Sequence, residues 1–182
     1  MVSPLGGHRA SELLNIPKAQ TLPLIFRSRG QTARLRKTPG ESVEHLLLKA
    51  LLWALYLPQY PNAQCEPAAC ELDVGNLYRP DVVALGATGE PSWWGECGSV
   101  SSTKISALAT KFPRTHFTVA KWARSDLSGY AGSLRSDVGG GPRVAPFEVL
   151  SFPADSGAER FVSDNGDVQI KWDDVLDHVL VH

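Results

Sequence analysis

The feature that most constrains the fold is the segment from residue 41 to residue 56, which is dense in leucine and alanine. Its apolar residues recur at helical spacing and form a broad stripe that includes Leu47, Leu48, Leu51, Leu52 and Leu55. The preceding Thr38-Pro39-Gly40-Glu41 has the form of a capping box with proline at the first helical position, and Pro58 ends the segment. So wide a stripe needs a large partner surface, and we expect this helix to lie flat against a sheet.

Three strand-like segments follow this helix, and after them come a second helix and a fourth strand. Their ranges are 64–74, where Pro67 indicates an edge strand, then 79–85, 92–98, 101–113 for the helix that Pro113 ends, and 116–122. Three adjacent strands followed by a helical crossover imply both antiparallel and parallel pairing. The sequence therefore predicts an α/β domain with a central mixed β-sheet of four or more strands, flanked by helices.

The remaining segments have weaker patterns. Residues 1–20 have little periodicity, so we expect a poorly ordered lead-in followed by one domain over 21–182 with its core at 38–122. The other predicted elements are an extended pair around Gly30 over 22–37, a loop with one helical turn over 123–145, strands at 147–152 and 168–172, and a short helix at 173–181.

Composition places the chain among globular proteins, with 43% hydrophobic and 20% charged residues. No apolar run approaches the roughly 18–20 residues that a membrane-spanning helix needs, and residues 1–10 lack the apolar core of a secretory signal. Three cysteines do not make a disulfide framework. We therefore expect a cytoplasmic protein that does not interact with a membrane.

Charge is distributed unevenly along the chain, although the formal net charge is only −1. Residues 1–50 carry a net charge of +5 and residues 51–182 a net charge of −6. The basic cluster Arg27, Arg29, Arg34, Arg36 and Lys37 is either a solvated hairpin or a contact surface for phosphates.

Two acids stand where neighbouring predicted strands meet. Asp81 opens the second strand and Glu96 lies near the end of the third, so pairing of these strands brings both carboxylates to one region of the sheet. Carboxylate oxygens suit a hard divalent cation such as Mg²⁺ or Mn²⁺, which orients phosphates and activates water. Glu44 heads the leucine stripe and is either a third member of this site or an acid favoured by the helix dipole.

With Glu44 in the leading helix, Pro80-Asp81 and Glu96-Cys97-Gly98, the sequence resembles the PD-(D/E)XK nuclease superfamily, whose fold is restriction-endonuclease-like. The resemblance covers about residues 38–122. It implies hydrolysis of phosphodiester bonds in DNA or RNA, with Mg²⁺ or Mn²⁺ held by Glu44, Asp81, Glu96 and the backbone carbonyl of Cys97.

One position departs from that pattern. The superfamily carries a lysine two residues after the second acid, where this sequence has Gly98. The resemblance implies that the lysine is supplied from elsewhere, and Lys104 in the first turn of the second helix is the first candidate, with Lys121 a weaker one. A side chain at Lys104 points back toward the end of the strand that carries Glu96.

The Glu-Cys-Gly sequence also resembles the YaeQ-like branch of this fold, in which a strand ending in acid-x-Gly precedes a helix carrying Lys or Arg. This resemblance implies that a chain of this fold that lacks the motif lysine binds without cutting. The alternative to the nuclease is therefore a non-catalytic interaction protein that retains the fold. Residues 150–182 contain seven acids and two bases, which suits a protein partner better than DNA or RNA.

Overall fold

The computed structural model describes residues 23–67, 72–73, 77–139, 142–155 and 158–182. Six strands form one sheet in the order β10-β9-β8-β7-β6-β3. Their bounds are β3 Gln64–Cys65, β6 Val82–Leu85, β7 Pro91–Cys97, β8 His116–Trp122, β9 Phe147–Phe152 and β10 Asp177–Leu180. β7, β8 and β9 are parallel, whereas the pairs β3–β6, β6–β7 and β9–β10 are antiparallel. The predicted mixed sheet is confirmed.

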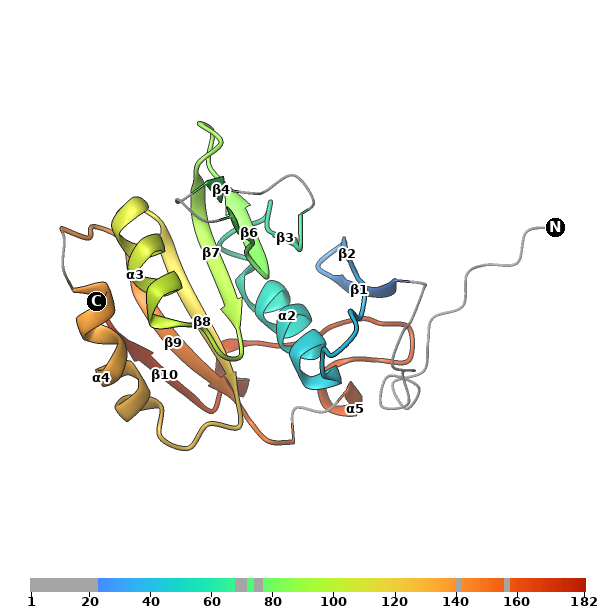
Figure 1. Ribbon diagram of the computed structural model, residues 1–182. Coiled ribbons are helices and arrows are strands. Elements are labelled where there is room, and N and C mark those ends of the chain that lie inside the picture. The colour runs from blue at the N-terminus through green and yellow to red at the C-terminus, as the bar shows by residue number, and fades with distance from the viewer. Residues whose placement is uncertain (1–22, 68–71, 74–76, 140–141, 156–157) are drawn as a thin grey trace.

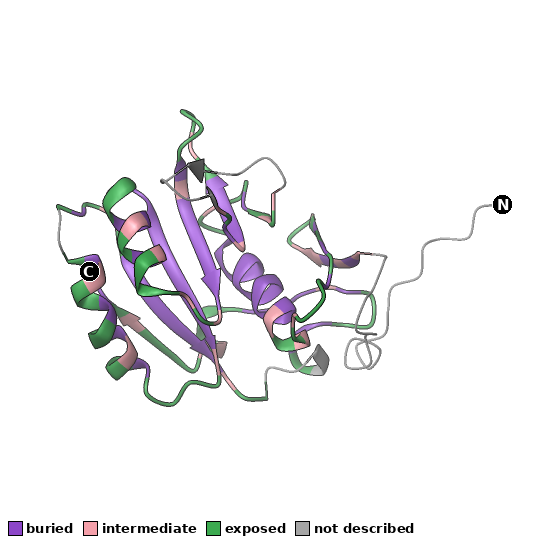
Figure 2. Ribbon diagram, viewed as in Figure 1, coloured by how far each residue is buried: buried purple, intermediate pink, exposed green. Residues whose placement is uncertain are grey.

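Helices cover both faces of this sheet. α2 (Val43–Tyr56) lies on one face, and α3 (Ser102–Lys111) and α4 (Leu127–Val138) lie on the other (Figure 1). Two apolar cores result, one around α2 and one between the sheet and the α3–α4 pair. Figure 2 shows the difference between them, because α3 and α4 expose their outer faces whereas α2 is buried without interruption from Leu46 to Tyr56.

α2 is buried on all sides because another part of the chain covers the side that faces away from the sheet. The hairpin of β1 (Leu24–Ser28) and β2 (Gln31–Leu35) packs its apolar side chains into the same core as α2. The outer edge of β1 bonds a later segment, since the Arg27 N–H donates to the Gly166 carbonyl at 2.8 Å and the Val168 N–H donates to the Arg27 carbonyl at 2.6 Å. The predicted extended pair is confirmed.

α2 approaches the sheet closely at Gly95 in β7. A Cβ atom at this position would lie 2.8 Å from Leu52 Cδ2, which is too near for any side chain. Glycine therefore allows the leucine of α2 to rest directly on the backbone of β7.

α2 begins two residues later than its predicted start at residue 41. Ser42 is the N-cap, and its hydroxyl accepts a hydrogen bond from the His45 N–H at 3.1 Å. Thr38 and Glu41 do interact as in a capping box, because the Glu41 carboxylate accepts bonds from the Thr38 N–H and hydroxyl. These bonds form a turn ahead of the helix, which places Glu41 outside it.

The predicted loop at 123–145 is wrong, because α4 occupies twelve of these residues. Asp126 caps it by accepting a hydrogen bond from the Gly129 N–H at 2.8 Å. Its buried positions follow a helical stripe that the intervening glycines and serines concealed: Leu127, Ala131, Leu134 and Val138.

The predicted strand at 168–172 and helix at 173–181 are also wrong. Val168 forms only an isolated bridge, residues 172–174 form the 3₁₀ helix η1 (Trp172–Asp174), and β10 completes the sheet beside β9. Pairing with β9 overrides the helical pattern over the four residues of β10.

The short elements near the sheet edge differ less from expectation. Pro67 does follow an edge strand, but β3 has two residues, and residues 72–73 form β4 (Leu72–Asp73), which pairs with β5 (Leu77–Tyr78) outside the main sheet. α5 (Ala158–Phe161) was not predicted. The lead-in predicted for 1–20 lies outside the described residues, and no helix that the structure describes is long and apolar enough to cross a membrane.

Candidate functional site

Asp81 lies directly before β6, beside the residue that ends β7. Its Oδ2 accepts a hydrogen bond from the Cys97 N–H at 2.7 Å, and its Oδ1 lies 3.4 Å from Lys49 Nζ and 3.6 Å from His45 Nε2. Burial acts to raise the pKa of Asp81, but the contacts with His45, Lys49 and the Cys97 amide outweigh it and lower the pKa. Asp81 is therefore an ionised carboxylate with both oxygens engaged.

Lys49 gathers three carboxylates around one ammonium group. Its Nζ lies 2.6 Å from Glu41 Oε1, 2.5 Å from Glu66 Oε1 and 3.4 Å from Asp81 Oδ1, and only 6% of its side chain is exposed. Burial acts to lower the pKa of Lys49, but the three acids raise it well above its usual value. We call Glu41, Lys49, Glu66 and Asp81 the acid cluster. Sequence reasoning missed it, although a lone charge inside an apolar helix was its signal.

Glu96 is paired with a different lysine. Lys104 Nζ lies 2.6 Å from Glu96 Oε1 and donates to the Arg79 carbonyl at 3.1 Å, so the predicted approach of Lys104 to Glu96 is confirmed. Trp94 Nε1 also donates to Glu96 Oε1, at 2.6 Å. Burial raises the pKa of Glu96, and the Asp81 carboxylate adds to this, against the opposing effect of Lys104.

The predicted metal ligands have different neighbours in the structure. Asp81 contacts α2 on one face of the sheet, whereas Glu96 contacts α3 and Trp94 on the other, and Glu44 is exposed. Across the described ranges, no group of three or more His, Cys, Asp and Glu side chains is arranged to hold a metal ion. These side chains therefore do not fit the divalent cation that the resemblance implies, because lysine ammonium groups already neutralise the acids.

Gly98 occupies the position of the motif lysine, and its backbone conformation explains why a glycine stands there. It has φ +74°, a left-handed conformation that L side chains rarely adopt, and a Cβ atom there would lie 3.2 Å from His45 Nδ1. The Gly98 N–H donates to the Ala120 carbonyl at 2.9 Å, which fixes this bend against β8. The bend excludes a lysine that follows the alternation of β7.

Gly98→Ala is expected to lower the free energy of unfolding by about 1–3 kcal/mol, because alanine is strained at positive φ. Gly132→Ala in α4 is the matched control, since nothing lies within 4 Å of the added Cβ. Alanine should raise stability there by about 0.5–1 kcal/mol. Urea unfolding measures both changes, and equal effects would show that the Gly98 bend is not required.

An open pocket of about 300 Å³ lies at the carboxyl ends of β7 and β8, beside the first turn of α2. Its polar and glycine lining residues are Ser42, Glu44, His45, Gly98, Ser99, Lys121 and Arg124. Ligands of open α/β sheets bind outside the carboxyl ends of the strands, and this pocket has that position. We call it the cationic pocket.

Lys121 is the most enclosed charge of the cationic pocket. Its Nζ donates to the Gly98 carbonyl at 2.5 Å and lies 4.0 Å from the centre of the Tyr130 ring. Burial, and then the neighbouring Arg124, lower the pKa of Lys121 to about 8. In the part of the chain that the structure describes, no carboxylate forms a salt bridge with Lys121 or Arg124, so both charges are available to an anion.

Another buried carboxylate lies at the opposite end of the sheet. Sequence reasoning missed it, and its signal was one acid in an apolar strand. Glu148 in β9 accepts a hydrogen bond from the Tyr56 hydroxyl, and its two oxygens lie 2.5 Å from His116 Nε2 and 2.5 Å from His178 Nε2. Tyr60 extends the chain, with its hydroxyl 2.8 Å from His116 Nδ1. We call these five residues the Glu148 network, which joins α2 to β8, β9 and β10.

No family model and no curated protein matches this sequence. Among solved structures, the YaeQ protein from Pseudomonas syringae is similar over 86% of this chain and 83% of its own, with a TM-score of 0.53 and 14% identity. The YaeQ protein from Xanthomonas axonopodis pv. citri is similar over 82% of this chain and 79% of its own, with a TM-score of 0.47 and 16% identity. Structural similarity at such low sequence identity shows the fold alone. The chain accordingly has a YaeQ-like fold, in which helices flank a mixed sheet.

Proposed function

We propose that this chain binds the phosphate backbone of nucleic acid at the cationic pocket and does not hydrolyse it. The observation that supports the absence of hydrolysis is the position of Lys49. Its ammonium lies within 3.4 Å of three carboxylates, where the charge of a catalytic metal ion would otherwise be needed. A buried ammonium with three acidic partners is held too firmly to be displaced by a hydrated divalent cation.

The charges of the cationic pocket support the choice of ligand. Lys121 and Arg124 face the same cavity, and a phosphate supplies the anion that both lack. Arginine binds phosphate oxygens in a bidentate manner, and a lysine with a pKa of about 8 is mainly protonated at neutral pH. Binding therefore weakens as the pH rises through about 8, since the ammonium is then lost.

A metal-dependent nuclease is the second candidate, and one observation favours it. Lys104 reaches Glu96 as the superfamily pattern requires, and the Asp81 carboxylate is near enough to raise the pKa of Glu96. In this candidate Asp81 and Glu96 would hold Mg²⁺ or Mn²⁺, which would activate the attacking water. The two candidates differ in one measurable respect, since only the nuclease cuts.

Fluorescence anisotropy with short labelled DNA and RNA tests the proposal in buffer that contains EDTA. We expect binding that weakens with salt, because phosphate contacts release counterions. Lys121→Gln and Arg124→Gln should each weaken binding by about tenfold and reduce the salt dependence. Arg114→Gln is the matched control, because Arg114 is exposed at the other end of β8.

The same oligonucleotides incubated with Mg²⁺ or Mn²⁺ should remain intact. Cleavage that Asp81→Asn and Lys104→Ala both abolish would establish the nuclease instead. If wild-type protein neither binds nor cuts, the alternative of a protein partner replaces both candidates.

A further inference from the structure

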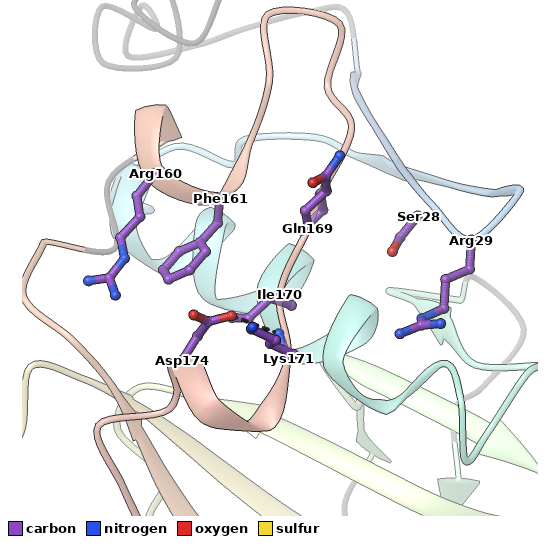
Figure 3. A pocket seen from close by; sticks show the side chains of 9 residues that line it. Ser28, Arg29, Arg160, Phe161, Gln169, Ile170, Lys171 and Asp174 are labelled. Atoms are coloured by element: carbon purple, nitrogen blue, oxygen red, sulfur yellow. Dashed lines mark hydrogen bonds between the residues drawn. The ribbon is translucent and has the colours of Figure 1, made fainter.

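A second open pocket, of about 600 Å³, lies between the tip of the β1–β2 hairpin and the segment that runs from α5 to η1 (Figure 3). It shares no lining residue with the cationic pocket. We propose that this hairpin pocket binds a small organic phosphate, with the phosphate held by Arg29 and Lys171. The assignment is independent of the proposed function.

Buried apolar residues and backbone hydrogen bonds fix the shape of the hairpin pocket. Phe161, Val168 and Ile170 line it with at most 8% of their surface exposed, as members of the core around α2. The bonds of Arg27 to Gly166 and Val168 hold the hairpin against this segment. The pocket therefore exists before a ligand arrives, so binding requires little ordering of the chain.

Two positive charges of the hairpin pocket have no salt-bridge partner among the residues that the structure describes. Figure 3 shows Arg29 across the cavity from Phe161 and Asp174, with Lys171 between them. Within the described segments, neither Arg29 nor Lys171 forms a salt bridge, because Asp174 instead accepts the Lys171 backbone N–H at 3.0 Å. Arg160, the third cation, is already paired with Asp155 at 2.5 Å.

Arg29 has a backbone conformation that the hairpin turn requires but that a long side chain rarely adopts. Arg29 and Gly30 form the two-residue turn of the hairpin, with φ of 50° and 77°. Such turns favour glycine or asparagine at both positions, and a long side chain in the left-handed region costs stability. A role for the guanidinium, which lines the pocket, explains an arginine at this position.

The lining selects the class of ligand. A phosphate monoester carries close to two negative charges at neutral pH, which match the Arg29 guanidinium and the Lys171 ammonium. Ser28 and Gln169 add side-chain donors at the rim, and the apolar residues below offer a surface to an organic group attached to the phosphate. Inorganic phosphate matches the two cations, but it has no organic group to place on the apolar surface.

Isothermal titration with phenyl phosphate, inorganic phosphate and benzoate tests the inference on the full chain. Phenyl phosphate should bind at least tenfold more tightly than either of the others, because it alone combines a dianion with an apolar group. Arg29→Gln should weaken this binding at least tenfold, whereas Arg34→Gln, an exposed position on the same hairpin, should leave it unchanged.

Arg29→Gly separates a binding role from a structural one. It removes the guanidinium and the strain together, so the melting temperature should rise while phenyl phosphate binding falls. The inference is overturned if phenyl phosphate does not bind, if Arg29→Gly binds it as well as the wild type, or if Lys121→Gln abolishes binding, which would place the ligand in the cationic pocket.

Discussion

Lys49→Met is expected to lower the free energy of unfolding by about 3–5 kcal/mol, the loss typical when one partner of a buried ion pair is removed. Methionine keeps the length of the side chain and its fit among the leucines of α2, so the change isolates the charge. Glu41, Glu66 and Asp81 then share a part-buried site with no cation between them. Urea unfolding at neutral pH measures the loss.

Addition of Ca²⁺ or Mg²⁺ should raise the melting temperature of Lys49→Met and leave that of the wild type unchanged. Three carboxylates without an internal cation are the ligands that such ions prefer. The double variant Lys49→Met/Asp81→Asn is the control, because it removes one of the repelling charges and should recover part of the lost stability. A loss below about 1 kcal/mol in Lys49→Met would contradict the strength assigned to the acid cluster.

Glu148→Ala should cost about 3–5 kcal/mol as well, since Glu148 is a buried charge that is bonded from three elements. The change leaves the Tyr56 hydroxyl and the His116 imidazole without their shared acceptor. Asp173→Ala, at an exposed position of η1, is the control and should alter stability by less than about 0.5 kcal/mol. Retention of full stability by Glu148→Ala would show that the network contributes nothing to the fold.

The pH dependence of this loss follows from two opposite pKa shifts. Burial acts to raise the pKa of Glu148, but the bonds from His116, His178 and Tyr56 lower it strongly, so its contribution is present above about pH 4.3 and is lost as the pH falls. Contact with Glu148 raises the pKa of His178, so that contribution is complete below about pH 6.5 and is lost as the pH rises through the raised value. The difference in stability between wild type and Glu148→Ala should therefore be largest at mildly acidic pH.

The local sequence pattern was sufficient to predict the elements whose apolar residues follow a regular spacing. The ranges of β8 and β9 agree with the prediction residue for residue, and α3 begins one residue inside the range expected for its helix. α4 was missed because its apolar stripe is interrupted by glycines and serines that favour loops. β10 was missed because its conformation depends on the exposed edge of β9, which no local pattern reveals.

In the candidate site too, the local contact was predicted and the contacts between distant segments were not. Lys104 was placed beside Glu96 from chain direction and helix geometry, which are local properties. The acid cluster around Asp81 was not predicted, because Glu41, Lys49 and Glu66 belong to a cap turn, a helix and the end of an edge strand. Whether Glu44, Asp81 and Glu96 take part in any chemistry stays a prediction that the proposed assays test.

The contact of Leu52 with Gly95 limits how the chain around the cationic pocket can move. Sliding of α2 along β7 would drive the leucine side chain into neighbouring residues with full side chains, so helix and strand must move as one body. Adjustment of the pocket to a ligand then falls on the turn before α2 and on the residues between Gly98 and α3. Amide hydrogens in these two short stretches should exchange with solvent far sooner than those of α2 and β7, and a bound ligand should slow them selectively.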